Sequence, residues 1–189
     1  MISPFLLHLY LMRTPITTER LILREIESSD AEDLFEMDSK IEVMKYIGIP
    51  PLKKIEEVYP MINMLQEQYK ENGIGRWAVE LKSTGEVIGW SGLKLHDEEI
   101  DGNINFYELG YRFKPQHWAK GYATESSKAW MDYAFHKIET DNVFGMTDPR
   151  HKNSKKVLMK MGFEYVKQVE FYNETVDWFV CNKTKYLNQ

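Results

Sequence analysis

Cysteine is nearly absent from this sequence of 189 residues, because Cys181 is the only one. A disulfide within the chain is therefore impossible, which excludes small disulfide-stabilised domains and favours a reducing, cytoplasmic setting. The chain also lacks a run of the roughly 20 apolar residues that a membrane helix needs. The apolar stretch near the start has neither a basic leading region nor a small-residue cleavage site. We therefore predict neither a membrane span nor a signal peptide.

An excess of basic charge is absent too. The formal net charge is −5, so a broad nucleic-acid footprint is not expected. An acidic surface suits a cationic partner such as an amine, although modest acidity mainly favours solubility. The five histidines show no metal-ligand spacing, and we expect no metal site. Internal repeats and low-complexity segments are also missing.

The length and the 43% hydrophobic content suit a single domain with a sizeable core. A natural domain start is the stretch MRTPITTERLIL, which begins at Met12. We therefore expect residues 1–16 to be an N-terminal extension and residues 17–189 to form the domain. The first eleven residues either pack as an added apolar arm or fray.

Hydrophobic periodicity and turn signals predict a mixed order of elements. A first strand is followed by three helices, a three-strand meander, a helix, a strand, a helix and a hairpin. The predicted ranges, in that order, are 19–25; 31–37, 41–47 and 55–71; 76–82, 87–96 and 103–113; 121–136; 142–147; 154–161; 163–171 with 175–186. This order predicts an α+β fold with helices on both faces of the sheet.

The stretch YELGYRFKPQHWAKGYAT, residues 107–124, runs from a predicted strand into a predicted helix. Gly121 lets the backbone approach a ligand closely, because it has no Cβ. The amides that follow have no acceptor within the helix, and the helix dipole favours negative charge there. The stretch is therefore a candidate phosphate cradle. Read alone, Gly121 is more often an ordinary glycine at a helix entry, and only the surrounding motifs favour the phosphate role.

Five segments occur in the order typical of one family: 18–24 (TERLILR), 42–48 (EVMKYIG), 108–111 (ELGY), 118–125 (WAKGYATE) and 154–163 (SKKVLMKMGF). Together they resemble the GNAT (GCN5-related N-acetyltransferase) superfamily, in its ribosomal-protein N-terminal acetyltransferase branch. The resemblance spans residues 18–185. It implies a mixed, mostly antiparallel sheet of about seven strands that splays between the fourth and fifth strands, here 103–113 and 142–147.

The resemblance also implies acetyl-CoA as co-substrate, with its pyrophosphate on the amides of residues 119–124 and its pantetheine arm in the splay. Two positions depart from the family pattern: Ala119 stands where many members have glycine, and His151 where they have asparagine. Ser154 would cap the last helix, and Lys120 would add a point charge. The implied cofactor-binding residues are Leu109, Tyr111, Phe113, Ala119, Lys120, Gly121, Tyr122, Ala123, Thr124, His151, Asn153 and Ser154.

Acetyl transfer to an amine needs a base, since an ammonium has no lone pair. Glu108, on the fourth predicted strand, is our first candidate; a structural carboxylate is the alternative. The tyrosine that many family members use as general acid corresponds here to Leu158, which cannot donate a proton. Tyr122, Ser154 or solvent could protonate the leaving thiolate, and Tyr122 is taken as the second catalytic candidate.

We therefore predict a cytoplasmic, acetyl-CoA-dependent N-acetyltransferase that acts by direct transfer on a primary amine. The acceptor is either a protein N-terminus or a small molecule, and the enzyme is a monomer or homodimer. One alternative is a non-catalytic acyl-CoA-binding module of the same fold. Another is a phosphate-binding protein unrelated to acyl transfer.

Overall fold

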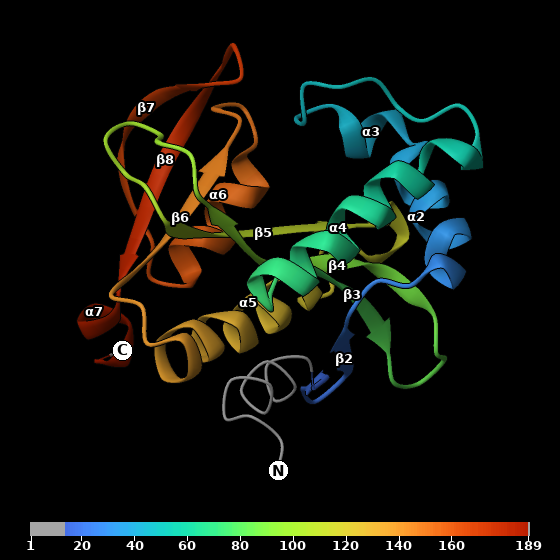
Figure 1. The fold of residues 1–189 in the computed structure, drawn as a ribbon, viewed down its shortest axis with the longest axis horizontal. Helices are drawn as coiled ribbons and strands as arrows, with labels where there is room; N and C mark the ends of the chain where they lie inside the picture. Colours follow the sequence, from blue (N-terminus) through green and yellow to red (C-terminus); the bar gives the residue numbers. More distant parts are fainter. Residues whose placement is uncertain (1–13, 189) are drawn as a thin grey trace.

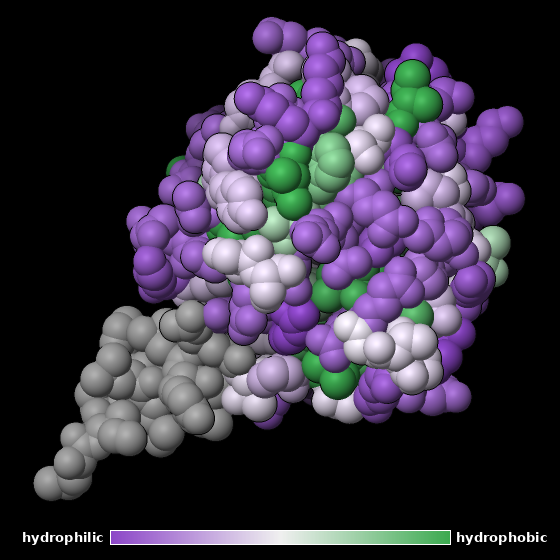
Figure 2. All heavy atoms as spheres, turned by 90° about the vertical axis from the view of Figure 1, so that its right-hand side faces the viewer, coloured by the Kyte–Doolittle hydropathy of each residue, from purple (hydrophilic) through white to green (hydrophobic). Residues whose placement is uncertain are grey.

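The computed structural model describes residues 14–188 (Figure 1). Most of the predicted N-terminal extension, residues 1–16, therefore lies outside the described residues. Ile16 is described, and it pairs with Leu23 in the first two strands of the sheet. Among the described residues, no helix is long and apolar enough to cross a membrane. In Figure 2, hydrophilic side chains cover most of the face in view, and apolar side chains form small separate patches.

The core of the molecule is one eight-stranded sheet with the strand order β1-β2-β3-β4-β5-β6-β8-β7. All neighbouring strands are antiparallel except β5 and β6, which are parallel. The strands are β1 (Ile16–Thr17), β2 (Leu21–Arg24), β3 (Arg76–Leu81), β4 (Val87–His96), β5 (Phe106–Phe113), β6 (Asn142–Thr147), β7 (Glu164–Phe171) and β8 (Glu174–Asn182). The expected mixed, mostly antiparallel sheet is confirmed. The sheet has eight strands instead of the predicted seven, because it includes the two-residue β1.

The sheet opens between β5 and β6, the fourth and fifth predicted strands. Their ladder contains only two pairs, Tyr107 with Val143 and Glu108 with Phe144. β5 continues to Phe113 in full register with β4, and β6 continues to Thr147 in register with β8. The backbone of β5 beyond Glu108 is therefore not paired with β6. In Figure 1, β6, β7 and β8 turn away from the rest of the sheet.

Helices cover both faces of the sheet, as predicted. α5 packs on one face, where Trp130 meets Trp77 of β3 edge to face at 5.1 Å between ring centroids. α6 lies on the same side, since Leu158 packs under Gly145 of β6. The opposite face carries α2, α3 and α4 (Figure 1). The helices are η1 (Ser28–Asp30), α2 (Ala31–Asp38), α3 (Ile41–Met44), η2 (Ile55–Glu57), α4 (Tyr59–Asn72), η3 (Pro115–His117), α5 (Tyr122–Tyr133), η4 (Ala134–Ile138), α6 (Lys152–Lys160) and α7 (Lys183–Leu187).

Two sequence-based boundaries are wrong. α6 begins at Lys152 with His151 as its N-cap, so Ser154 does not cap the helix but lies in its first turn. The last strand was predicted to reach residue 186, but it ends at Asn182. The side chain of Asn182 accepts a hydrogen bond from the Thr184 amide at 3.0 Å and starts α7. An Asn side chain that caps local amides competes with the strand ladder, which the alternating pattern does not reveal.

Candidate active site

A cavity of about 740 Å³ lies beside the unpaired end of β5, past the point where β5 parts from β6. Its walls come from α3, the end of β5, the segment that enters α5, and the segment that enters α6. Since α3 lies on one face of the sheet and α5 and α6 on the other, the walls include segments from both faces. Its lining residues are Glu42, Val43, Lys45, Tyr46, Ile47, Tyr111, Arg112, Phe113, His117, Trp118, Ala119, Gly121, Tyr122, Ala123, Thr124, Arg150, His151, Lys152, Asn153, Ser154 and Val157.

The predicted phosphate cradle forms one end of this cavity. Gly121, with φ 85°, is the N-cap of α5, so the first-turn amides of the helix open onto the cavity. Ala119 is also left-handed, with φ 58°, although it has a side chain. The turn is anchored to the end of β5, because the Trp118 Nε1 donates to the Phe113 carbonyl at 2.7 Å. A backbone with two left-handed residues before a helix start presents its amides to one point, as an anion site requires.

Two contacts bridge the walls of the cavity. The Tyr111 hydroxyl, on β5, donates to the Ser154 carbonyl at 3.0 Å and lies 3.2 Å from the Ser154 hydroxyl, on α6. The rings of Tyr46 and His151 stack at 4.3 Å and so join the segment after α3 to the start of α6. Burial lowers the pKa of His151, against the opposing charge of Asp148. His151 is therefore a neutral ring at neutral pH.

Glu108 lies where the β5–β6 ladder ends, on the face that carries α2 and α3. Arg76 donates from Nη2 to its Oε2 at 2.6 Å and from Nη1 to its carbonyl at 2.8 Å. His96 Nε2 lies 3.1 Å from the same Oε2. Burial by itself raises the pKa of Glu108, but the charge of Arg76 and the contact with His96 outweigh it and lower the pKa. Glu108 is thus ionised at neutral pH and held in one position.

Ten of the twelve predicted cofactor-binding residues line the cavity. The exceptions are Leu109, whose side chain is buried in the core, and Lys120, whose side chain is exposed. Glu108 is not a lining residue either. Tyr122 lines the cradle end, where its ring lies 4.5 Å beneath the guanidinium of Arg20. Tyr122 therefore lies near the Phe113 end of β5, and Glu108 lies near the other end. Five residue steps, about 17 Å of strand, separate Glu108 from Phe113.

The sequence reasoning missed the cationic side chains of the cavity. They are Lys45, Arg112, Arg150 and Lys152, against the single carboxylate of Glu42. The run Arg150-His151-Lys152 was a visible signal, because three basic residues precede a helix start. No local signal indicated Lys45 or Arg112, which the tertiary structure brings to the cavity from α3 and β5. Arg112 pairs with Asp38 at 2.8 Å and Arg150 with Asp148 at 2.6 Å, so two of these four charges are already neutralised by carboxylates.

Residues 14–188 contain no candidate metal-binding site. That part of the chain contains no group of three or more His, Cys, Asp or Glu side chains arranged to hold a metal ion. The buried carboxylate of Glu108 is instead paired with Arg76. The absence of a metal site stays a prediction for the whole protein.

Two solved structures share this fold over nearly their whole length. Spermidine N-acetyltransferase from Vibrio cholerae, in complex with CoA and spermine, has a TM-score of 0.70 at 20% identity and covers 89% of this chain and 99% of its own. Ribosomal-protein-S5-alanine acetyltransferase from Vibrio fischeri has a TM-score of 0.68 at 18% identity, with 92% and 98% covered.

Sequence similarity shows the family of this chain as well as its fold. The uncharacterized N-acetyltransferase p20 of Bacillus licheniformis is 33% identical over 147 residues, which are 78% of this chain and 80% of that relative. The family model of the acetyltransferase (GNAT) domain matches residues 20–164, from β2 to the start of β7. This chain therefore belongs to the GNAT acetyltransferase family.

Proposed function

We propose that the protein transfers the acetyl group of acetyl-CoA directly to a primary amine. The observation that carries the proposal is the cavity beside the unpaired end of β5, which has walls from both faces of the sheet and includes the left-handed cradle at Gly121. Such a cavity suits a long ligand with an anionic end and a second substrate that approaches from the other face. CoA has that shape and charge.

The cradle end would hold the phosphates. The amides of residues 119–124 point from a helix N-terminus, which favours an anion. Lys45 and Lys152 line the same cavity and add positive charge. The unpaired edge of β5 from residue 109 to residue 113 would hydrogen-bond the amide groups of the pantetheine arm, as a strand does with an added partner. Leu109 would take part through its backbone alone.

Glu108 lies outside the cavity lining, where β5 parts from β6, and we place the meeting point of the thioester and the amine beside it. The Glu108 carboxylate takes one proton from the incoming ammonium, directly or through a water, so that the neutral nitrogen can attack the carbonyl carbon. The C–S bond then breaks, and the second proton of the nitrogen passes to solvent. A backbone amide of β5 would polarise the carbonyl. The CoA thiolate has an ordinary thiol pKa of about 8.5, so it can leave without a general acid and take a proton from solvent. Leu158 is buried under Gly145 and supplies none.

The class of amine stays open. The two structural neighbours act, by their names, on spermidine and on the alanine of ribosomal protein S5. Their TM-scores with this chain, 0.70 and 0.68, do not separate a polyamine from a protein N-terminus. An ionised Glu108 suits either acceptor, because both arrive as ammonium ions. The predicted cytoplasmic setting and the monomer or homodimer state also stay predictions.

The test is thiol release from acetyl-CoA with polyamines, aminoglycosides, amino acids and short peptides, together with calorimetric titration of CoA. We expect CoA to bind and at least one amine to release thiol. Binding without release from any amine would favour a non-catalytic acyl-CoA-binding module. A thermal shift with nucleotides but none with CoA would overturn the proposal in favour of a different phosphate ligand.

A further inference from the structure

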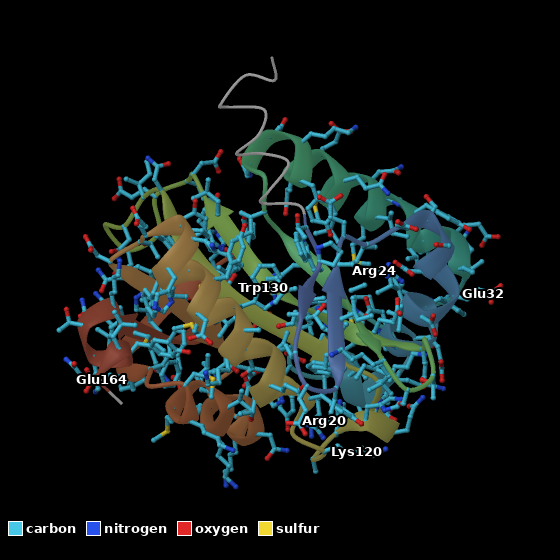
Figure 3. The ribbon with its side chains drawn as sticks, turned by 90° about the horizontal axis from the view of Figure 1, so that it is seen from below. Arg20, Arg24, Glu32, Lys120, Trp130 and Glu164 are labelled. Carbon is cyan, nitrogen blue, oxygen red and sulfur yellow. The ribbon has the colours of Figure 1, made fainter. Side chains whose placement is uncertain are left out.

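Arg20, the residue before β2, makes four contacts with the cradle a hundred residues later. Its Nε donates to Glu125 Oε2 at 2.7 Å, its backbone amide donates to Glu125 Oε1 at 2.8 Å, and its Nη1 donates to the Lys120 carbonyl at 3.0 Å. Its guanidinium also lies over the Tyr122 ring. Figure 3 shows Arg20 beside Lys120, well away from Arg24 at the end of β2.

Glu125 is the reason that these contacts matter for an anionic ligand. It is the fourth residue of α5, so its carboxylate lies in the first turn of the helix whose amides form the cradle. Burial raises the pKa of Glu125, but hydrogen bonds from Thr18 and Arg20 outweigh this and lower it. The group is therefore an anion beside a proposed phosphate site, where it repels phosphate unless a cation neutralises it.

The second role of Arg20 is geometric. The Lys120 carbonyl belongs to the Lys120–Gly121 peptide. The residues on either side of Lys120, Ala119 and Gly121, are both left-handed. A carbonyl held by Nη1 fixes the plane of that peptide and turns the Gly121 amide to the opposite side. A Cβ on Gly121 would lie 3.3 Å from Nη2, so the guanidinium closely backs the cradle.

We propose that Arg20 is a positioning residue for acetyl-CoA: it neutralises Glu125 and fixes the Lys120–Gly121 peptide so that the cradle can take the pyrophosphate. The inference rests on the proposed function. It assigns a ligand-binding consequence to the N-terminal segment TERL, residues 18–21, which lies outside the cavity lining.

Arg24, the last residue of β2, provides a matched control. It too pairs with two carboxylates, Asp30 and Glu80, each at 2.8 Å. Its partners lie away from the cavity lining. Replacing Arg24 therefore measures what a paired arginine of β2 contributes to stability, without an effect on the cavity.

The experiment is calorimetric titration of CoA into wild type, R20A, R24A, E125Q and R20A/E125Q. Wild type is measured first, and its failure to bind CoA would count against the proposed function rather than against Arg20. For R20A we expect the Kd for CoA to rise about tenfold at low ionic strength and less at high salt, because salt screens the uncovered Glu125 charge. R20A/E125Q should recover the part of that loss that the uncovered Glu125 charge causes, and R24A should bind as wild type does.

Kinetics give a second readout that lost stability would not produce. R20A should raise KM for acetyl-CoA without a matching fall in kcat, and should leave KM for acetyl-pantetheine, which lacks the phosphates, unchanged. If R20A does not fold, Arg20→Met is measured in its place, because methionine keeps the aliphatic part of the arginine side chain. An unchanged Kd in a folded Arg20 variant, or no recovery on adding E125Q, would overturn the inference.

Discussion

Arg76 holds Glu108 by its side chain and by its backbone at the same time, through Nη2 to Oε2 and Nη1 to the carbonyl oxygen. The guanidinium can do so because Gly110, two residues on, leaves room for it: a Cβ there would lie 2.6 Å from Arg76 Cζ. An arginine of β3 thus fixes a carboxylate of β5 where that strand parts from β6.

Replacing Glu108 by Gln tests the proposed base. Because proton transfer to a positioned carboxylate typically contributes 10²–10⁴-fold, we expect kcat to fall about 100-fold or more, with little change in the Kd for CoA. Glu80→Gln is the matched control, since Glu80 also pairs with an arginine but belongs to the Arg24 cluster. Equal turnover of E108Q and wild type at every pH would remove Glu108 from the mechanism.

Gly110→Ala should displace Arg76. The added methyl group overlaps the guanidinium, and overpacking of this kind costs about 1–3 kcal/mol. Urea unfolding of G110A, R76A and the double variant measures the coupling. We expect the cost of G110A to shrink strongly when Arg76 is already absent. Additive effects would mean that the methyl group clashes elsewhere.

Acid should weaken the contribution of Glu108 to stability. Its folded-state pKa is lowered by Arg76 and His96 against the effect of burial. The unfolded chain therefore binds the proton first, and stability that is present above the ordinary glutamate pKa of about 4.3 is lost as pH falls through the lower folded pKa. Unfolding titrations from pH 7 to pH 3 should show the stability gap between wild type and E108Q narrowing. A gap that widens in acid would contradict the assigned direction.

Ala119→Gly should stabilise the protein. A left-handed backbone strains a residue that has a Cβ, and glycine relieves about 0.5–1 kcal/mol after its own entropy cost. Ala129→Gly, in the interior of α5, makes the same chemical change in a right-handed helix and should destabilise by about 1 kcal/mol. Opposite signs in urea unfolding would confirm the strain. Destabilisation by both would show that Ala119 makes contacts worth more than its strain.

Cys181 should be inert in the native state. Its side chain is fully buried, and burial raises the pKa of the thiol to about 11. The thiolate is the reactive form, so at pH 8 we expect labelling by a disulfide reagent to be about 100-fold slower than in urea. Unchanged turnover of Cys181→Ala would confirm that the thiol has no part in transfer. Rapid native labelling would show that the strand opens.

Local chemistry made several elements predictable. The ladder of β6 coincides with the predicted range 142–147, because alternating residues there bury one face only. Gly162 follows α6 in a left-handed conformation, which a glycine after a helix favours, and the Phe163 amide donates to the Leu158 carbonyl at 3.1 Å. The Gly121 turn was also readable, since a glycine before a helix start is a local signal.

The cavity walls that lie far apart in the sequence were not predictable in this way. Arg112 was read as one residue of a strand, and Tyr46 as one of a short helix, yet both line the cavity. Glu108 was recognised by its position in the family motif, but its pairing with Arg76 and His96 depends on the register of three strands. A single sequence does not contain that register in local form.

The sequence by itself determined most of the elements, the family and the Gly121 turn, because helix starts, strand alternation and left-handed turns depend on neighbouring residues. The tertiary structure alone decided which charges meet: Glu108 with Arg76, and Glu125 with Arg20. Electrostatic interactions depend on distance in space and on burial, and neither quantity is set by separation along the chain.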